Sequence, residues 1–271
     1  MTIPEAPENH AAPVDPDAAP VDRGRQATAP GRRGPGPALL VGLGVAVLIA
    51  GAFAFLASRH REQQAQLIRV SGIPSTVSTP LANLMGLAPI PPKPAPDFTL
   101  TDQNGHALSL SAFRGRAVVM EFMDTHCTDI CPLVSQEFVD AYHDLGADAS
   151  QVVFVAVNVN GYHAAVADAA QFSNEHQLNT IPNWHFLTGP VSDLHPVWDD
   201  YGVVVQAPSP GADIIHSSFA FFIGPDGTER YLGNPTDDHT SSGAAYLPAG
   251  TLTSWGQGIA LVSQSLIGQR H

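Results

Sequence analysis

The chain has 271 residues, and its first third is rich in proline, alanine and glycine and poor in aromatic side chains, so only the remainder can form a hydrophobic core. The formal net charge of -13 comes mainly from Asp and Glu scattered through the second half, where no Lys/Arg cluster could follow a phosphate backbone. We therefore expect no nucleic-acid partner. The only two cysteines, Cys127 and Cys131, lie four positions apart, which excludes a disulfide framework and places both in one site.

Three segments are predicted to precede the folded domain. Residues 1–37 lack hydrophobic periodicity and predict a disordered tail. Residues 38–57 contain no charged or strongly polar side chain and are long enough to cross a bilayer as one helix, so we predict a single transmembrane helix. The alternative is a cleaved signal peptide, because small residues lie near the end of this span, although the preceding segment is long for one. The proline-containing residues 58–93 predict a linker.

The positions of Lys and Arg around the apolar span favour a cytoplasmic amino terminus only slightly. This orientation would place the rest of the chain on the extracytoplasmic side of the cell membrane.

Residues 94–271 have the mixed pattern of one α/β domain. Residues 97–110 predict a β-hairpin with a polar turn, and the apolar run 117–123 predicts a buried strand that leads into the cysteine loop. A helix is expected to begin at the second cysteine, because Pro132 suits the first helical position, and to end at Gly146.

The remaining pattern continues the alternation of strands and helices. Predicted strands are 152–159, 184–187, 214–223 and 228–232, and predicted helices are 164–176, 193–201 and 252–266. Pro196 should kink or shorten the helix that contains it. A strand, helix, strand order implies a parallel sheet with a right-handed crossover, so the predicted fold class is α/β.

The position of the cysteine pair, between a central strand and a helix, favours thiolates, because the helix N-terminus stabilises negative charge. Cys127 and Cys131 are separated by three residues, one more than in the usual dithiol redox motif. Spacing alone leaves open a structural disulfide, a redox pair and a metal clamp. Two thiolates on one loop would form a soft site suited to Cu(I), and an added imidazole would let it accept Cu(II) as well.

A third ligand must be chosen among many histidines. In thioredoxin-like folds the cysteine loop faces the loop that leads into the next antiparallel strand, where oxidoreductases usually carry a cis-proline. That position carries no proline here, and His216 would face the cysteines from it. His126 is the competing ligand, but it directly precedes Cys127, and adjacent residues do not easily point at one ion.

With these residues the chain resembles the Sco family of copper chaperones over about residues 94–232. The matching segments are APDFTL at 95–100, THCTDICP at 125–132, HSS at 216–218 and FIGPDG at 222–227. The resemblance implies a thioredoxin-like fold, with a central mixed sheet flanked by helices, behind one N-terminal transmembrane helix. It further implies that Cys127, Cys131 and His216 bind copper and that the acceptor is the dinuclear copper centre of cytochrome c oxidase.

The resemblance has one departure. Where the family often has a Ser-Val-Asp-Pro stretch after the second central strand, residues 158–163 read NVNGYH and lack the carboxylate.

Other functions remain open at this point. The main alternative is a thiol-disulfide oxidoreductase in which Cys127 attacks a partner disulfide and Cys131 resolves the mixed disulfide. The hypothesis of a peroxidase is less well supported, because the sequence offers no identifiable Thr and Arg partners for an activated cysteine. The remaining alternative is an adhesion or scaffold domain in which the two cysteines form a structural disulfide and take part in no reaction.

Overall fold

The structure is a computed structural model. It describes residues 72–235, 238–240, 245–248 and 250–268, together with residues 51–52, 54–56 and 59. Contacts divide the chain into two units, Met1–Arg59 and His60–His271. The described residues of the first unit are helical.

The predicted tail 1–37 and most of the predicted membrane span 38–57 lie outside the described residues. Among the residues that are described, no helix combines the length and the apolar character that a membrane crossing needs.

A six-stranded mixed sheet forms the centre of the second unit, in the order β1-β10-β9-β4-β5-β6. Its strands are β1 (Ala88–Pro94), β4 (Ala117–Met123), β5 (Val152–Asn158), β6 (Trp184–Leu187), β9 (Ala220–Ile223) and β10 (Thr228–Gly233). Strands β4, β5 and β6 are parallel, whereas β9 is antiparallel to β4, β10 to β9 and β1 to β10. The predicted α/β class and parallel crossover are confirmed.

Helices cover both faces of this sheet. They are α2 (Thr79–Leu84), α3 (Ile130–Leu145), α4 (Val166–Glu175), α5 (Val191–Asp200) and α6 (Thr251–Gly268), with 3-10 turns η1 (Leu110–Phe113), η2 (Gly146–Gln151) and η3 (Leu178–Thr180). Helices α2, α3, α4 and α6 contribute to the core on one face, and α5 contributes to the core on the other. The hairpin of β2 (Thr99–Thr101) and β3 (Ala107–Ser109) packs on the same face as α5.

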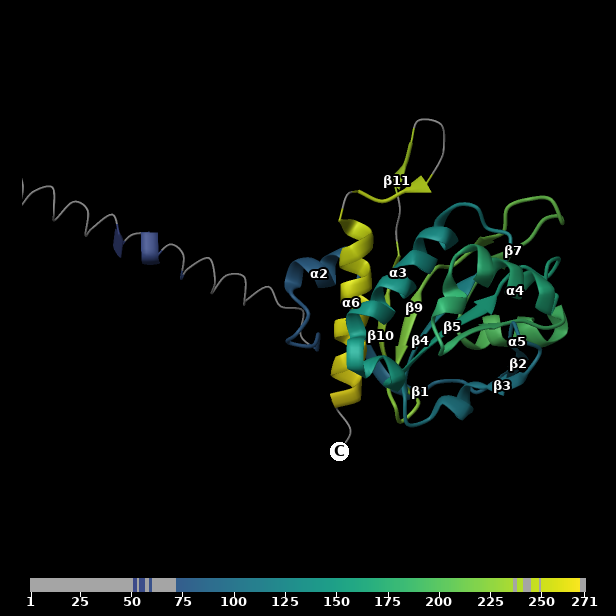
Figure 1. Ribbon diagram of the computed structural model, residues 1–271, viewed down its shortest axis with the longest axis horizontal. Helices are drawn as coiled ribbons and strands as arrows, with labels where there is room; N and C mark the ends of the chain where they lie inside the picture. Colours follow the sequence, from purple (N-terminus) through teal and green to yellow (C-terminus); the bar gives the residue numbers. More distant parts are fainter. Residues whose placement is uncertain are drawn as a thin grey trace, which may run out of the picture. The chain divides into compact units, whose positions relative to one another are not determined.

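Figure 1 shows α6 beside α3, and these two helices are in extensive contact. Gly256 permits the close approach, because a Cβ at this position would lie 2.6 Å from the Cβ of Asp140. Helix α6 therefore packs closely against the C-terminal half of α3, the helix that begins at the cysteine loop.

The interior strands β4 and β5 are buried on both faces of the sheet, which explains why their sequences are continuous apolar runs. Every residue of β4 and of β5 is buried. Along β4, Val119 faces the core under α3 and α6, whereas Val118 and Met120 face the core under α5. Both predicted strands are confirmed to within one residue.

The segment predicted as a linker differs from the expectation. Its second half forms α2 and β1, and β1 pairs with β10 at the edge of the sheet. Prolines are tolerated there because an edge strand has no second neighbour to receive its N–H groups, and the register shifts between Pro89 and Lys93. Met85, fully buried, joins this segment to the core.

Three other predictions need correction. The strand expected at 214–223 is divided into β8 (Ile215–His216), which pairs with β7 (Val205–Gln206), and β9, which belongs to the central sheet. Helix α3 begins at Ile130, so Pro132 is its third residue and not its first. Helix α5 continues through Pro196 up to Asp200, so this proline does not shorten the helix.

Two further strands, β11 (Asp238–His239) and β12 (Ala245–Tyr246), form a small antiparallel pair.

Candidate metal-binding site

The cysteine loop connects the end of β4 to the start of α3. Asp124 shapes it, because its Oδ1 atom accepts a hydrogen bond from the backbone N–H of His126 at 2.8 Å and its carbonyl accepts one from Cys127 at 3.2 Å. The backbone N–H of Cys131, in the first turn of α3, donates to Sγ of Cys127 at 3.4 Å. The first cysteine is therefore held at the N-terminus of the helix, as predicted.

The two thiols differ in protonation. A hydrogen bond from the Cys131 side chain lowers the pKa of Cys127 to about 7 against the opposing effect of burial, and the N–H groups of Cys131 and Asp129 lower it further. The pKa of Cys131 is raised well above its usual value, because its thiol donates to Cys127, is buried and faces the negative charge of Cys127. Near neutral pH a part of the protein therefore carries a thiolate at Cys127, while Cys131 keeps its proton. Both cysteines are free thiols.

His216 lies on β8, opposite Val205 of β7. Burial lowers the pKa of its imidazole, partly opposed by the Ser217 carbonyl and by the charge of Asp124, so the ring is neutral near pH 7. Its Nδ1 atom lies 3.1 Å from the carbonyl oxygen of Ser217. Because a carbonyl can only accept, Nδ1 carries the hydrogen and Nε2 keeps its lone pair for a ligand.

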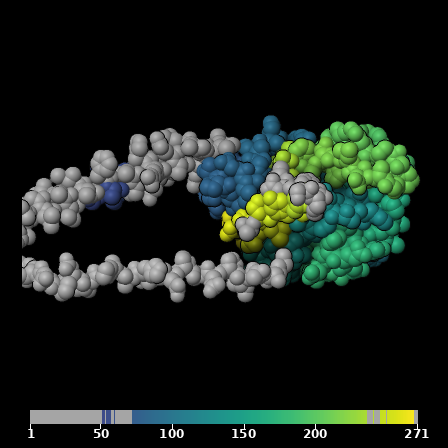
Figure 2. Space-filling model, turned by 90° about the horizontal axis from the view of Figure 1, so that it is seen from above, coloured from purple at the N-terminus to yellow at the C-terminus, as the bar shows by residue number. Residues whose placement is uncertain are grey.

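Cys127 and His216 line the same cleft, which has a volume of about 860 Å³. One wall is the cysteine loop with Asp124, and the other is the segment 210–216 that leads into β8. In Figure 2 the segment around β7 and β8, in light green, forms a raised lobe on the surface of the second unit. Cys131 is buried and does not line the cleft, but its side chain hydrogen-bonds to that of Cys127. Two of the three predicted residues, Cys127 and His216, thus line one cleft, and the third contacts Cys127.

His126 has different neighbours. Its ring stacks on that of His163 with 3.5 Å between the centroids, and its Nε2 atom lies 3.8 Å from Oδ1 of Asp168. No sequence pattern pointed to His163 or Asp168 as ligands, although His163 lies in the segment 158–163 where the chain departs from the Sco pattern. Asn160 links this loop to the cysteine loop, because its Nδ2 donates to Oδ1 of Asp124 at 2.8 Å.

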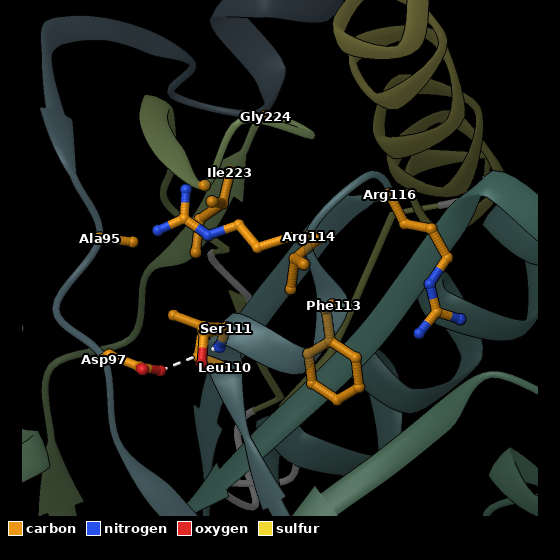
Figure 3. A pocket seen from close by; sticks show the side chains of 11 residues that line it. Ala95, Asp97, Leu110, Ser111, Phe113, Arg114, Arg116, Ile223 and Gly224 are labelled. Atoms are coloured by element: carbon orange, nitrogen blue, oxygen red, sulfur yellow. Dashed lines mark hydrogen bonds between the residues drawn. The ribbon is translucent and has the colours of Figure 1, made fainter.

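A second, much smaller hollow contains none of the predicted residues (Figure 3). The guanidinium of Arg114 occupies it above Gly227, where a Cβ would overlap that group. The Ser111 N–H donates to Oδ1 of Asp97 at 2.9 Å on its floor. This hollow is filled by the protein's own side chain and offers no reactive group, so the cysteine cleft is the candidate site.

The chain matches one family model and is similar to several proteins named SCO1 or SCO2. Residues 90–244 match the family model described as SCO1/SenC. The chain is 27% identical over 132 residues to the SCO1 protein homolog of Bacillus subtilis, covering 48% of this chain and 68% of that protein. It is 31% identical over 137 residues to the SCO2 homolog of mouse mitochondria, covering 48% of this chain and 52% of that protein.

Among solved structures, the chain is similar to Bradyrhizobium japonicum ScoI with copper bound, at 21% identity and a TM-score of 0.49, covering 64% of this chain and 99% of that one. The family model spans more than half of this chain, starting within β1 and ending before β12, and includes both cysteines and His216. On this match the protein belongs to the SCO1/SenC family.

Proposed function

We propose that this protein is a copper chaperone in which Cys127, Cys131 and His216 bind one copper ion for delivery to an acceptor protein. The observation that carries the proposal is the shared cleft, which both Cys127 and His216 line, while the Cys131 thiol donates a hydrogen bond to Cys127. Membership of the SCO1/SenC family agrees with it.

The available donor atoms fit copper. Two sulfurs are soft ligands that select Cu(I), and a neutral imidazole suits both Cu(I) and Cu(II). Cys127 supplies a thiolate near neutral pH, because its pKa is lowered to about 7. Cys131 would lose its proton only when the ion arrives, since metal binding competes with protons for a thiol of raised pKa. His216 needs no deprotonation, because burial already favours its neutral form.

Delivery to an acceptor requires that the ion can be reached from outside. The cleft is open and wide, and Cys127 is only partly buried, so acceptor thiols or imidazoles could displace the ligands one at a time. No bond between non-metal atoms has to be made or broken. As the family resemblance implies, we propose the dinuclear copper centre of cytochrome c oxidase as the acceptor.

We further propose that the apolar segment 38–57 anchors the chain in the cell membrane, with the copper-binding domain on the extracytoplasmic side. Truncation before residue 60 should then release the protein from membranes to the soluble fraction. Retention of the truncated chain on membranes would contradict the anchor.

The ligand set is tested by titrating the reduced full-length chain with copper under exclusion of oxygen. We expect one tightly bound ion, and sulfur-to-Cu(II) charge-transfer absorption when Cu(II) is used. His216→Ala should lower the affinity for Cu(II) about 10- to 100-fold, whereas Cys127→Ser should abolish the charge-transfer band. The matched control is His195→Ala, because His195 is an exposed histidine whose neighbours Asp199 and Trp198 lie on its own helix. Equal affinity in the His216 and His195 variants would move the third ligand elsewhere.

The asymmetry of the two thiols also favours a second candidate function, thiol-disulfide exchange. Cys127, partly exposed and of lowered pKa, would attack a partner disulfide as a thiolate, and one partner sulfur would leave as a thiol after taking up a proton. Cys131 would then lose its proton and displace the second partner sulfur, which leaves the chain oxidised and the partner reduced.

The two candidate functions differ in their need for the imidazole. Exchange with a disulfide substrate should vanish in Cys127→Ser and survive in His216→Ala. Copper binding should be weakened in both variants. If the activity of the protein is lost in both variants, the protein acts through the metal.

A further inference from the structure

A second group of ligand-type side chains lies beside the cysteines. His126, His163 and Asp168 each offer one ligand atom, and the three atoms lie within 4.8 Å of one another. They come from the cysteine loop, the loop after β5 and the first turn of α4. His126 and His163 also line the cysteine cleft, so this group opens into the same space.

The backbone of His163 is fixed on both sides. Its carbonyl accepts hydrogen bonds from Oγ1 of Thr125 at 2.8 Å and from Nδ2 of Asn158 at 2.9 Å. Its N–H donates to Oδ1 of Asn160 at 3.2 Å. The imidazole of His163 is therefore held beside the cysteine loop by bonds that do not use the ring.

The carboxylate of Asp168 is divided between two roles. Its Oδ2 atom accepts the N–H of Ala165 at 3.0 Å and so caps α4. This bond orients the carboxylate and leaves Oδ1 facing Nε2 of His126 at 3.8 Å. Carboxylates that bind metal ions are usually oriented by such an additional hydrogen bond.

The three atoms need only a small adjustment to bind one ion. Ligand atoms around a tetrahedral ion at metal distances of about 2.1 Å are separated by about 3.4 Å, so no pair in the group must approach by more than about 1.4 Å. His126 can supply this movement, because its side chain is 49% exposed. Its ring would turn out of the stack with His163 to present its nitrogen to the ion.

We propose that His126, His163 and Asp168 form a second metal site, distinct from the cysteine site, for a divalent ion of the Cu²⁺ and Zn²⁺ class. Two imidazoles and one carboxylate are borderline to hard ligands that favour these divalent ions, whereas two thiolates favour Cu(I). One cleft thus holds two ligand sets of different softness side by side. The second site does not need the cysteines, so it can be tested in their absence. The result of this test is therefore independent of whether the chaperone function is correct.

The test uses the full chain with Cys127→Ser, Cys131→Ser and His216→Ala combined, which removes the proposed copper ligands. Titration of this protein with Zn²⁺ by calorimetry should reveal one site, and loading with Cu²⁺ should give nitrogen coupling from two imidazoles in electron spin resonance. Adding His126→Ala or His163→Ala should lower the Zn²⁺ affinity at least about tenfold and remove one nitrogen from the Cu²⁺ signal.

Two further variants separate ligation from folding. Asp168→Asn keeps an oxygen that can cap α4 but removes the charge, and it should also weaken Zn²⁺ binding about tenfold. His195→Ala is the matched control, because His195 and Asp199 form a histidine–carboxylate pair at 3.1 Å for which no third ligand lies near among the described residues. Circular dichroism checks that each variant is folded, and the exposed His126 makes its alanine variant the least disruptive. No Zn²⁺ binding in the triple variant, or affinities within twofold after His126→Ala, would overturn the proposal.

Discussion

The two walls of the cysteine cleft are built very differently. The wall with the cysteines is the junction of β4 and α3, and the core directly beneath it contains Met123 and Phe138, which are at most 1% exposed. The wall with His216 is the β7–β8 hairpin, whose strands have two residues each and whose Val204 and Ile215 are 60% and 64% exposed. The sulfurs thus lie on elements anchored in the core, whereas the imidazole lies on a short hairpin with exposed apolar side chains beside it.

The largest effect is expected on the first wall. Phe138→Ala would empty a fully buried position on α3, where the ring packs against Phe154 and Trp184 at centroid distances of 5.5 Å and 5.6 Å. We expect a loss of about 3–5 kcal/mol in the free energy of unfolding. Chemical denaturation under reducing conditions measures it, and a loss below about 1 kcal/mol would show that this wall is not supported by the core.

The first wall was also the more predictable. Strand β4 and helix α3 follow from a continuous apolar run and an amphipathic repeat, which are local signals. The second wall has no such signal, because β8 contains only Ile215 and His216 and the sequence predicted one strand through to Ile223. Position relative to the cysteine loop, inferred from the thioredoxin-like pattern, still pointed to His216.

Two parts of the molecule were not predicted, for different reasons. The proline-rich β1 resembles a linker in sequence, and only its place at the sheet edge makes it a strand. The group of His126, His163 and Asp168 depends on two loops that are linked through Asp124 and Asn160, a contact between residues 36 positions apart. Such convergence depends on the three-dimensional fold and not on spacing within either loop.

The next largest effect concerns a buried carboxyl group behind the first wall. Burial raises the pKa of Glu121, on β4, from 4.5 to about 8, and burial with the charge of Glu121 raises that of Glu137 on α3. Among the described residues, Oε1 of Glu121 and Oε2 of Glu137 have no hydrogen-bond partner. Between pH 4.5 and about 8, Glu121 therefore keeps its proton in the folded protein, whereas the same carboxyl group is ionised in the unfolded chain.

Because the folded state holds the extra proton, stability falls as pH rises through this window and is not affected by this group below it. Glu121→Gln removes the free energy that the unfolded chain gains by ionising this carboxyl group, so the stability of the variant relative to the parent should rise by roughly 3 kcal/mol between pH 4.5 and pH 7. Denaturation curves at these two pH values measure the gain. The control is Glu175→Gln at an exposed position of α4, and a parent protein with the same stability at both pH values would contradict the prediction.

The smallest effect is expected on the second wall, at the residue next to the proposed imidazole ligand. Ile215→Ala removes a side chain that is 64% exposed and pairs only with Gln206 across the β7–β8 hairpin, so the free energy of unfolding should change by no more than about 0.5 kcal/mol. The same variant should leave the affinity for Cu(II) within about threefold, because the backbone pairing of His216 with Val205 does not depend on this side chain. Denaturation and copper titration of one preparation measure both. A loss of stability similar to that of Phe138→Ala would mean that the hairpin is packed as firmly as the core, and the two walls would then place their ligands by the same means.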